Sequence, residues 1–585
     1  MILLDARFPR TLDRLVEDLR REAPRGHVEA WLFEDEAPRR RAERALAAVG
    51  VRATLRSAYK PLVHAFLEEI ARDDLRRVTL TYPVEAGADP ARFLLEAYPL
   101  AALVGPAAFE ARPGPPGLAY LVETEDRRGR VTRHPVRAPN RVVPDAAGEP
   151  ALTSSGWLRV EGGRDGPLET EFEAAFAAVL GTLGACPVAG TGPLFDRLLL
   201  DVALPGIERP LGGGGASVGT VMSLAEALHE DLYFAAHEAL ARRAGRAPGD
   251  RAFRPGQVVP VVLPGEGGTR VRIAAVPHRV VEPETEGWAG PLDVAESPPG
   301  LARVADELAA LGGDGFKARS VQGRPVPGCH LAAPGPAILV TAAQHGNETS
   351  GVVGGLRAAR HLRGRAHLAI VSVENPDGYA LHRALCRRQP GHIHHAARLT
   401  ALGDDLEARI EGAETEAAPA GPLHEAAARV EALRRTGAGL HVNLHGYPAH
   451  EWTRPLTGYV PRGFAAWTIP KGFFLILRHR PGWRGAAEAL VEAVAARLAA
   501  MPGLAAFNAD QLRLAAAHGS PAPGPLRHGI PCLIEESPRL ATPLMLITEF
   551  PDETITGAPF RFAHEAQMRA VLAAAEAWQA MAPIA

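Results

Sequence analysis

Hydrophobic positions recur along the chain with two periods, that of a strand and that of a helix, and the two alternate from segment to segment. In residues 1–150 this alternation predicts a small α/β unit. Its helical runs are 10–21 and 37–49, and its strand-like runs are 27–33, 51–55 and 76–84. A glycine- and proline-rich stretch at 113–167 follows these runs.

Residues 151–294 predict a second unit, of the α+β kind. Helical spacing occurs at 169–183 and 223–245, and strand-like runs occur at 195–204, 258–263 and 269–278. The proline- and glycine-rich segment 282–300 is the natural linker to the C-terminal half of the chain. Neither unit contains a motif that indicates a chemistry. We hypothesise that this two-part extension covers or narrows the cleft of the next domain.

Residues 295–585 contain longer apolar strands that alternate with helices. The strand runs are 337–343, 367–374, 439–446, 472–478 and 543–550, and the helical runs include 350–363, 485–500 and 564–581. Such alternation predicts an α/β domain in which helices lie against a sheet.

Composition narrows the class of protein. With 46% hydrophobic and 22% charged residues, the 585-residue chain can bury ordinary cores, which excludes a mainly disordered protein, a coiled coil and a membrane protein. The net charge is −3 (64 − 67), which argues against a nucleic-acid or anionic-membrane partner. The four cysteines form no CxxC pair, and the N-terminus has no long apolar stretch, so we expect a cytoplasmic protein. Arginine far outnumbers lysine, which is typical of GC-rich bacterial coding. The sequence does not indicate an oligomeric state.

The first candidate for chemistry is the sequence QHGNETSG, which directly follows the apolar run 337–343. It places His345 and Glu348 at the C-terminal end of a strand, where open α/β sheets build their sites. Residues three apart on one helical turn point the same way. An imidazole and a carboxylate there are two of the three protein ligands of a His₂Glu catalytic zinc site, although so short a pattern does not establish one.

The third ligand should be a histidine from another strand end. His445 follows the apolar run that begins at 439 and precedes a Gly-Tyr turn, which favours it. His441 lies on the same strand at an even offset and points to the same face further back. His450 lies in the loop beyond. Three protein ligands would leave a fourth position open for water, as catalytic zinc requires.

Glu549 is a candidate general base, because it ends the very apolar strand 543–550. A carboxylate there is costly unless it has a role, and burial would raise its pKa towards the working pH. The alternative is a strand-end carboxylate that caps a neighbouring helix or pairs with an arginine.

Taken together, these motifs resemble the zinc carboxypeptidases of the funnelin type. The resemblance covers about 295–585 and is carried by HGNE, LHGY, Glu549 and further segments. These segments are VQGRPV (321–326), ENPDGY (374–379) and GDDL (403–406), the last of which falls where the family has Gly-x-Asp-x-Asn-Arg. The resemblance implies an α/β fold with a mixed, eight-stranded sheet sandwiched by helices, and one catalytic Zn²⁺ per chain.

Residue by residue, the resemblance implies zinc ligation by His345, Glu348 and His445, with Glu549 as general base. Asp405 matches the aspartate that hydrogen-bonds the first zinc histidine, an arrangement that fixes the tautomer of the ligand. An arginine of the loop after the NPDG turn normally stabilises the oxyanion. Of the three arginines between 383 and 388, Arg388 is the predicted one.

The resemblance fails where the family clamps a C-terminal carboxylate. Counting on from Asp405, the family's Asn-Arg pair is replaced by Glu407 and Ala408, and Arg409 comes one residue late. A carboxylate cannot replace the fork of an arginine. Either Arg398 or Arg409 substitutes through a shifted backbone, or Glu407 favours a cationic or amide-blocked group. Tyr447 is a further candidate for substrate binding.

The sequence therefore predicts a zinc-dependent hydrolase that cleaves an amide bond of a peptide or N-acyl amino acid. The first expectation is a carboxypeptidase-like enzyme with atypical recognition of the C-terminal end. HGNE also resembles the N-acyl amino acid deacylases of the aspartoacylase and succinylglutamate desuccinylase type, which is the enzyme alternative. A zinc-binding pseudoenzyme or scaffold is the non-enzyme alternative.

Overall fold

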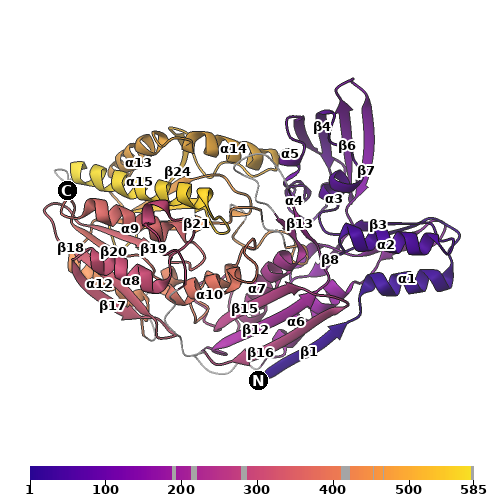
Figure 1. Ribbon diagram of the computed structural model, residues 1–585, viewed down its shortest axis with the longest axis horizontal. Coiled ribbons are helices and arrows are strands. Elements are labelled where there is room, and N and C mark those ends of the chain that lie inside the picture. Colours follow the sequence, from indigo (N-terminus) through magenta and orange to yellow (C-terminus); the bar gives the residue numbers. More distant parts are fainter. Residues whose placement is uncertain are drawn as a thin grey trace.

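The computed structural model describes residues 1–186, 193–211, 221–278, 286–409, 422–451, 454–464 and 467–581. They form a C-terminal domain built on one large sheet and an N-terminal extension of smaller sheets (Figure 1). Residues 282–285 of the predicted linker lie outside the described residues.

The large sheet is mixed, as the sequence predicts for this domain. Within the described residues it has nine strands, in the order β17-β18-β20-β19-β21-β25-β22-β24-β23. Eight were predicted, and the ninth is accounted for by β23, a two-residue strand that forms a hairpin with β24 at one edge. Strands β20, β19, β21 and β25 are mutually parallel, so their carboxyl ends meet at one edge. The bounds are β17 Asp314–Arg319, β18 Pro325–Leu331, β19 Ile338–Ala342, β20 Leu368–Val371, β21 Leu440–Tyr447, β22 Phe474–His479, β23 Leu526–Arg527, β24 Ile530–Glu536 and β25 Leu544–Pro551.

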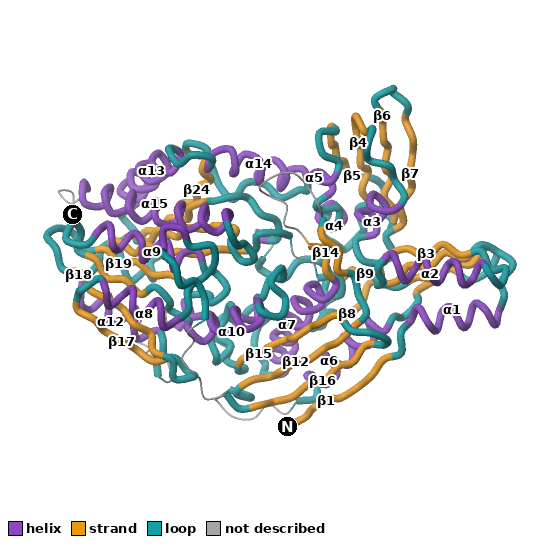
Figure 2. Tube along the Cα trace, in the orientation of Figure 1, coloured by secondary structure: helices purple, strands orange, loops and turns teal. Residues whose placement is uncertain are grey.

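Helices cover both faces of this sheet (Figure 2). On one face α8, α9, α13 and α15 share an apolar cluster with Leu440, Val442 and Leu444 of β21. On the other face α12 packs against Leu339 of β19. Because side chains alternate along a strand, the odd-numbered positions of β21 leave the sheet on the face opposite to α9. The helices are α8 Leu301–Ala310, α9 Ser350–Leu362, α10 Pro376–Cys386, α12 Ala426–Thr436, α13 Arg484–Ala499, α14 Leu504–Ala517 and α15 Ala558–Met581.

In its described residues the extension contains three four-stranded sheets, and two of them join strands from both sides of residue 150. The first has the order β1-β16-β12-β15, the second β11-β10-β2-β3, and the third β5-β4-β6-β7. The predicted boundary at 150 therefore does not separate two sheets. The strands are β1 Ile2–Phe8, β2 Val28–Leu32, β3 Ala53–Ser57, β4 Leu75–Tyr82, β5 Ala108–Pro113, β6 Ala119–Asp126, β7 Val131–Arg137, β10 Trp157–Val160, β11 Asp165–Pro167, β12 Arg197–Leu204, β15 Gln257–Pro264 and β16 Thr269–Val276, with the pairs β8 Asn140–Pro144 and β9 Pro150–Ser154, and β13 Glu208–Pro210 and β14 Val221–Ser223.

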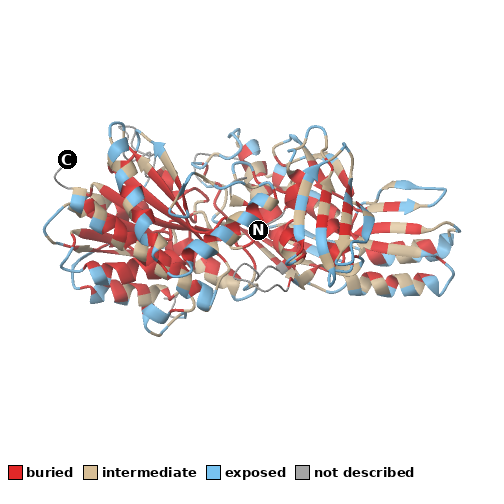
Figure 3. Cartoon of the chain, turned by 90° about the horizontal axis from the view of Figure 1, so that it is seen from above, coloured by how far each residue is buried: buried red, intermediate tan, exposed pale blue. Residues whose placement is uncertain are grey.

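One helix of the extension, α7 (Leu224–Arg243), joins it to the C-terminal domain. Apolar residues of α7 share a core cluster with Leu381 and Leu385 of α10. Glu226 of α7 accepts a hydrogen bond from the ring of His450 at 2.8 Å, and Asp231 accepts one from the backbone of Leu456 at 3.1 Å. Buried residues consequently run through both halves of the molecule (Figure 3). The other helices of the extension are α1 Thr11–Glu22, α2 Glu36–Ala47, α3 Pro61–Glu68, α4 Arg92–Glu96, α5 Leu100–Leu103 and α6 Glu171–Gly184.

The described helices were also compared with the requirements of a membrane span. None of them is by itself both long enough and apolar enough. Taken as a pair, α13 and α14 meet the requirement by length and composition, but the chain bends by 103° between them.

The contact between α9 and α15 generates a stability prediction. A Cβ added to Gly354 would lie 2.5 Å from Cβ of Gln567 and 3.0 Å from backbone atoms of α15, whereas one on Gly355 would meet nothing closer than 3.4 Å. We expect Gly354→Ala to destabilise the protein by about 1–3 kcal/mol through overpacking. Gly355→Ala, the control, should be neutral or stabilising because alanine favours helices. Thermal melting followed by circular dichroism measures both, and equal midpoints for the two variants would contradict the close packing.

Candidate metal centre

The four residues predicted to carry the chemistry lie together at the carboxyl edge of the parallel strands. His345 and Glu348 lie in the loop between β19 and α9, His445 is on β21, and Glu549 is on β25. His445 is paired in register with Glu549 across two parallel strands. Residues paired in this way leave the sheet on the same face, so the two side chains lie side by side.

A close approach between backbones fixes the loop that carries His345. A Cβ on Gly346 would lie 2.1 Å from the carbonyl carbon of Gly378, so only glycine fits against the NPDG turn. Asp377 of this turn accepts a hydrogen bond from Arg324 at 2.7 Å. Three segments that carry the family resemblance are therefore in contact in the structure.

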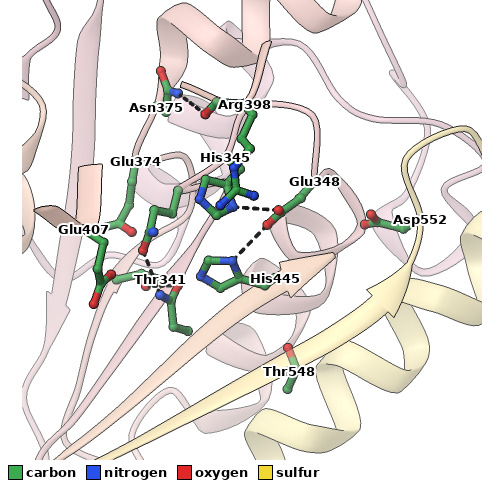
Figure 4. Close-up of polar contacts among 12 residues, drawn as sticks. Thr341, His345, Glu348, Glu374, Asn375, Arg398, Glu407, His445, Thr548 and Asp552 are labelled. Carbon is green, nitrogen blue, oxygen red and sulfur yellow. Dashed lines mark hydrogen bonds and ion pairs between the residues drawn. The ribbon is translucent and has the colours of Figure 1, made fainter. Parts of the chain in front are cut away.

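Glu348 lies between two imidazole rings (Figure 4). Its Oε1 is 2.6 Å from Nδ1 of His345, and its Oε2 is 3.1 Å from Nδ1 of His445. One ligand atom from each residue lies within 4.8 Å of the others, and no other group of three or more such residues in the described part of the chain meets this spacing. The spacing suits a single ion, because zinc ligands lie about 2.0–2.2 Å from the metal.

The charges around Glu348 fit a bound cation. Burial and the charge of Glu348 raise the pKa of Glu549 well above its usual range, although Arg398 opposes the rise. Burial also raises the pKa values of Asp552 and Glu553 to about 7, and Glu348 adds to both shifts. So many buried acids cost free energy unless their charge is neutralised. A cation held by Glu348 would offset that cost, so the residues present fit a metal ion.

The two alternative histidines have other partners. Nε2 of His441 is 2.8 Å from the hydroxyl of Thr341, and burial together with Arg429 holds its pKa well below its usual range. His450 is bonded to Glu226 of the extension. His445 is therefore the histidine of this stretch that faces Glu348.

Asp405 lies behind His345, with Oδ2 3.5 Å from its Nε2. The same oxygen accepts hydrogen bonds from Nη2 of Arg251 at 2.7 Å and from Nη2 of Arg398 at 3.4 Å. Although burial raises it, the pKa of Asp405 is held well below its usual range, most strongly by Arg251. Arg251 belongs to the extension and was not predicted.

The arginine at the centre is Arg398 and not Arg388. Arg388 is exposed beyond the end of α10 and does not line the cavity of the site. Arg398 lines it and lies over the ring of Phe464, 5.4 Å from the ring centre. Its backbone is held by the NPDG turn, because the amide of Asn375 donates hydrogen bonds to the carbonyls of Arg398 and Leu399, both at 3.2 Å. The prediction that an arginine after this turn lies at the site was made from the sequence, but it named Arg388, which is closer to the turn along the chain than Arg398.

The residues predicted to bind the end of the substrate do not all lie at the cavity, because some of them line it and one is buried in the core. Glu407 lines the cavity, and Arg429 behind it outweighs burial and lowers its pKa. Arg409 is fully buried between Asp404 and Glu425 and does not line the cavity. Tyr447 lines the cavity, but its hydroxyl donates to the carbonyl of Gly472 at 2.6 Å and accepts from the amide of Lys471 at 2.9 Å.

A cavity of about 570 Å³ opens in front of these residues. The extension supplies one wall, from α7 and from residues 248–253, and the C-terminal domain supplies the rest. Aromatic side chains from both parts line it: Tyr233, Phe234, Phe253, Phe464 and Trp467.

Comparison with known proteins gives distant structural likenesses. No family model and no curated protein matches the chain. The chain is similar over about half its length to solved metallopeptidases and related hydrolases. They include a metallo-carboxypeptidase from Burkholderia cenocepacia (18% identity, 54% of this chain and 76% of that one, TM-score 0.29), a murein-tripeptide amidase from Escherichia coli O157 (18%, 45% and 91%, 0.25) and a succinylglutamate desuccinylase/aspartoacylase from Rhodobacter sphaeroides (13%, 43% and 62%, 0.24). Likenesses this weak assign no substrate.

The geometry predicts one tightly bound divalent ion per chain. His345→Ala removes a ligand and should lower metal affinity by orders of magnitude, whereas His441→Ala removes a buried histidine of the same sheet that lies outside the cluster. Metal content after dialysis, measured by mass spectrometry, checks both. If His441→Ala lost the metal and His345→Ala kept it, the ligand assignment would be wrong.

Proposed function

We propose that this protein is a zinc-dependent hydrolase that cleaves an amide bond in a small peptide or peptide-like substrate. The observation that carries the proposal is the register pairing of His445 with Glu549. This pairing puts the buried carboxylate of Glu549 beside the cluster of His345, Glu348 and His445, and all four residues line the cavity. A metal cluster and a separate acid are the two parts that such hydrolysis requires.

His345, Glu348 and His445 would hold the zinc. Zinc, when bound, would supply a Lewis acid that lowers the pKa of a water molecule and polarises a carbonyl. Glu549 takes the proton from the attacking water and returns it to the leaving amine. Its Oε2 is buried and makes no hydrogen bond among the described residues, so it is available to accept a proton.

Arg398 is the proposed partner of the negative charge that develops on the substrate carbonyl. It lines the cavity, and its charge opposes the rise in the pKa values of both His345 and Glu549, so it is close to the reacting centre. Stacking on Phe464 and the contact with Asp405 hold the guanidinium in place before the charge develops, as effective oxyanion stabilisation requires.

Glu407 is proposed to set the specificity for the end of the substrate. Arg429 forms two hydrogen bonds with Glu374 and one, at 3.3 Å, with Oε2 of Glu407. This leaves Glu407 ionised at the cavity wall. An anionic wall repels a free carboxylate and favours a cationic or amide-blocked group. The enzyme would therefore differ from a carboxypeptidase that trims unmodified ends.

A second candidate is an N-acyl amino acid deacylase, which the cavity of about 570 Å³ favours because this volume suits a small substrate. Assays of N-acyl amino acids beside short peptides separate the two. Zinc binding without turnover of either class would favour the pseudoenzyme or scaffold alternative.

Replacing the proposed base separates chemistry from metal binding. Glu549→Gln keeps the shape of the side chain but accepts no proton, so we expect kcat to fall by at least about a hundredfold. Zinc content should stay at the wild-type level, because Glu549 is not a ligand. The assay uses purified zinc-loaded protein with the best substrate of a broad amide library. Retained turnover in Glu549→Gln would falsify the assignment.

Glu407 generates a specificity prediction. The wild type should cleave peptides with an amide-blocked or cationic end in preference to the same peptides with a free carboxylate. Glu407→Gln should weaken that preference by about tenfold, mainly through KM, because it removes a charge from the wall. Glu425→Gln is the matched control, since Glu425 pairs with Arg409 away from the cavity. A wild-type preference for free carboxylates would rule out this role of Glu407 and would point instead to Arg398 as their anchor.

A further inference from the structure

A short segment of the extension, residues 250–256, lies directly against residues 402–405 of the C-terminal domain. The backbone amide of Asp405 donates to the carbonyl of Arg251 at 3.0 Å, and the amide of Gly256 donates to the carbonyl of Leu402 at 2.8 Å. A Cβ on Gly403 would lie 2.4 Å from the carbonyl oxygen of Gly256, so the backbones are in close contact.

Two arginines of this segment bind two successive aspartates. Arg251 donates to Oδ2 of Asp405 from Nε at 3.1 Å and from Nη2 at 2.7 Å. Arg254 donates from Nε to Oδ2 of Asp404 at 2.9 Å. Both aspartates are buried, while the arginine side chains are 52% and 28% exposed. The extension thus reaches into the C-terminal domain through two comparable ion pairs.

Only one of the two aspartates touches the metal centre. Oδ2 of Asp405 is 3.5 Å from Nε2 of His345, the ring nitrogen turned away from Glu348. Oδ1 of Asp405 accepts a hydrogen bond from the backbone amide of Glu407 at 3.0 Å, which fixes the other oxygen of the carboxylate. Asp404 instead bonds Thr400 and Arg409. A carboxylate held in this way orients the imidazole that it contacts, and therefore the ligand atom on the other side of the ring.

We propose that Arg251 is a positioning residue through which the extension completes the metal centre. It holds the Asp405 carboxylate in the orientation that directs Nδ1 of His345 towards the ion, and this inference rests on the proposed metal site. The extension is then part of the metal centre itself and not only a cover over the cavity. The competing explanation is that Arg251 merely helps to dock the extension, as Arg254 does.

Arg254 makes the test a matched comparison. Arg251→Met and Arg254→Met each remove one arginine–aspartate pair from the same segment, and each leaves the aspartate with another arginine, Arg398 or Arg409. A docking role predicts equal effects of the two changes. A positioning role predicts that only Arg251→Met weakens zinc binding.

The measurement is zinc affinity of the full-length protein, from competition with a chromophoric chelator in the absence of substrate. We expect Arg251→Met to weaken zinc binding by about ten- to a hundredfold, and Arg254→Met to leave it near the wild-type value. Arg251→Lys keeps the charge without the fork and should fall between the two. The visible spectrum of the cobalt-substituted protein should change in Arg251→Met and not in Arg254→Met.

Equal zinc affinities in Arg251→Met and Arg254→Met, or tighter binding in Arg251→Met, would overturn the proposal. Melting of the metal-free proteins separates folding from metal binding, and Arg251→Lys serves if Arg251→Met does not fold. If the wild type itself binds no zinc, the metal site and the proposed function fail, which is a different result from failure of the role of Arg251.

Discussion

The interaction on which the rest depends is the placement of one buried carboxylate, Glu348, between two imidazoles, that of His345 in the loop after β19 and that of His445 on β21. It exists because parallel strands end at a common edge, so that a loop after β19 and the end of β21 meet. Gly346 lets the loop pass against the NPDG turn, and Gln567 of α15 donates a hydrogen bond to the carbonyl of His445 at 2.8 Å. The cluster is thus fixed by the NPDG turn and by α15.

That placement gathers buried acids, since Glu549, Asp552 and Glu553 lie near Glu348, and burial of each raises its pKa and so disfavours its ionised form. A fold that keeps such a group together without a counter-charge would lose stability. The arginines nearby are largely engaged with other acids, Arg429 with Glu374 and Arg251 with Asp405. The acids at the strand ends are therefore best matched by a cation held at their centre.

The sequence allowed the cluster and Glu549 to be predicted because His345, His445 and Glu549 each lie at or just after the end of an apolar run, and Glu348 follows His345 by three residues. The central strands of the sheet followed from these apolar runs, and its mixed order was implied by the family resemblance, but β23 was not predicted, because two residues carry no period. Arg388 was chosen over Arg398 because the sequence gives the order of the loop after the NPDG turn but not its path. Arg251 could not be found at all, since it meets Asp405 across 154 positions and no motif surrounds Arg251 itself.

The contacts between the two parts of the chain also show that the extension is bonded to the loops that surround the cavity. α7 buries acids that bind backbone and histidine groups of the C-terminal domain, so the interface is polar and specific and not simply apolar. Segment 250–256 contacts the loop of Asp405 and Glu407, and both this loop and α7 line the cavity. Asp405 of that loop contacts His345, the proposed metal ligand, and Glu407 lines the cavity, where we propose that it meets the end of the substrate. In the proposed enzyme, a shift of the extension would therefore change the orientation of His345 and the position of Glu407 together.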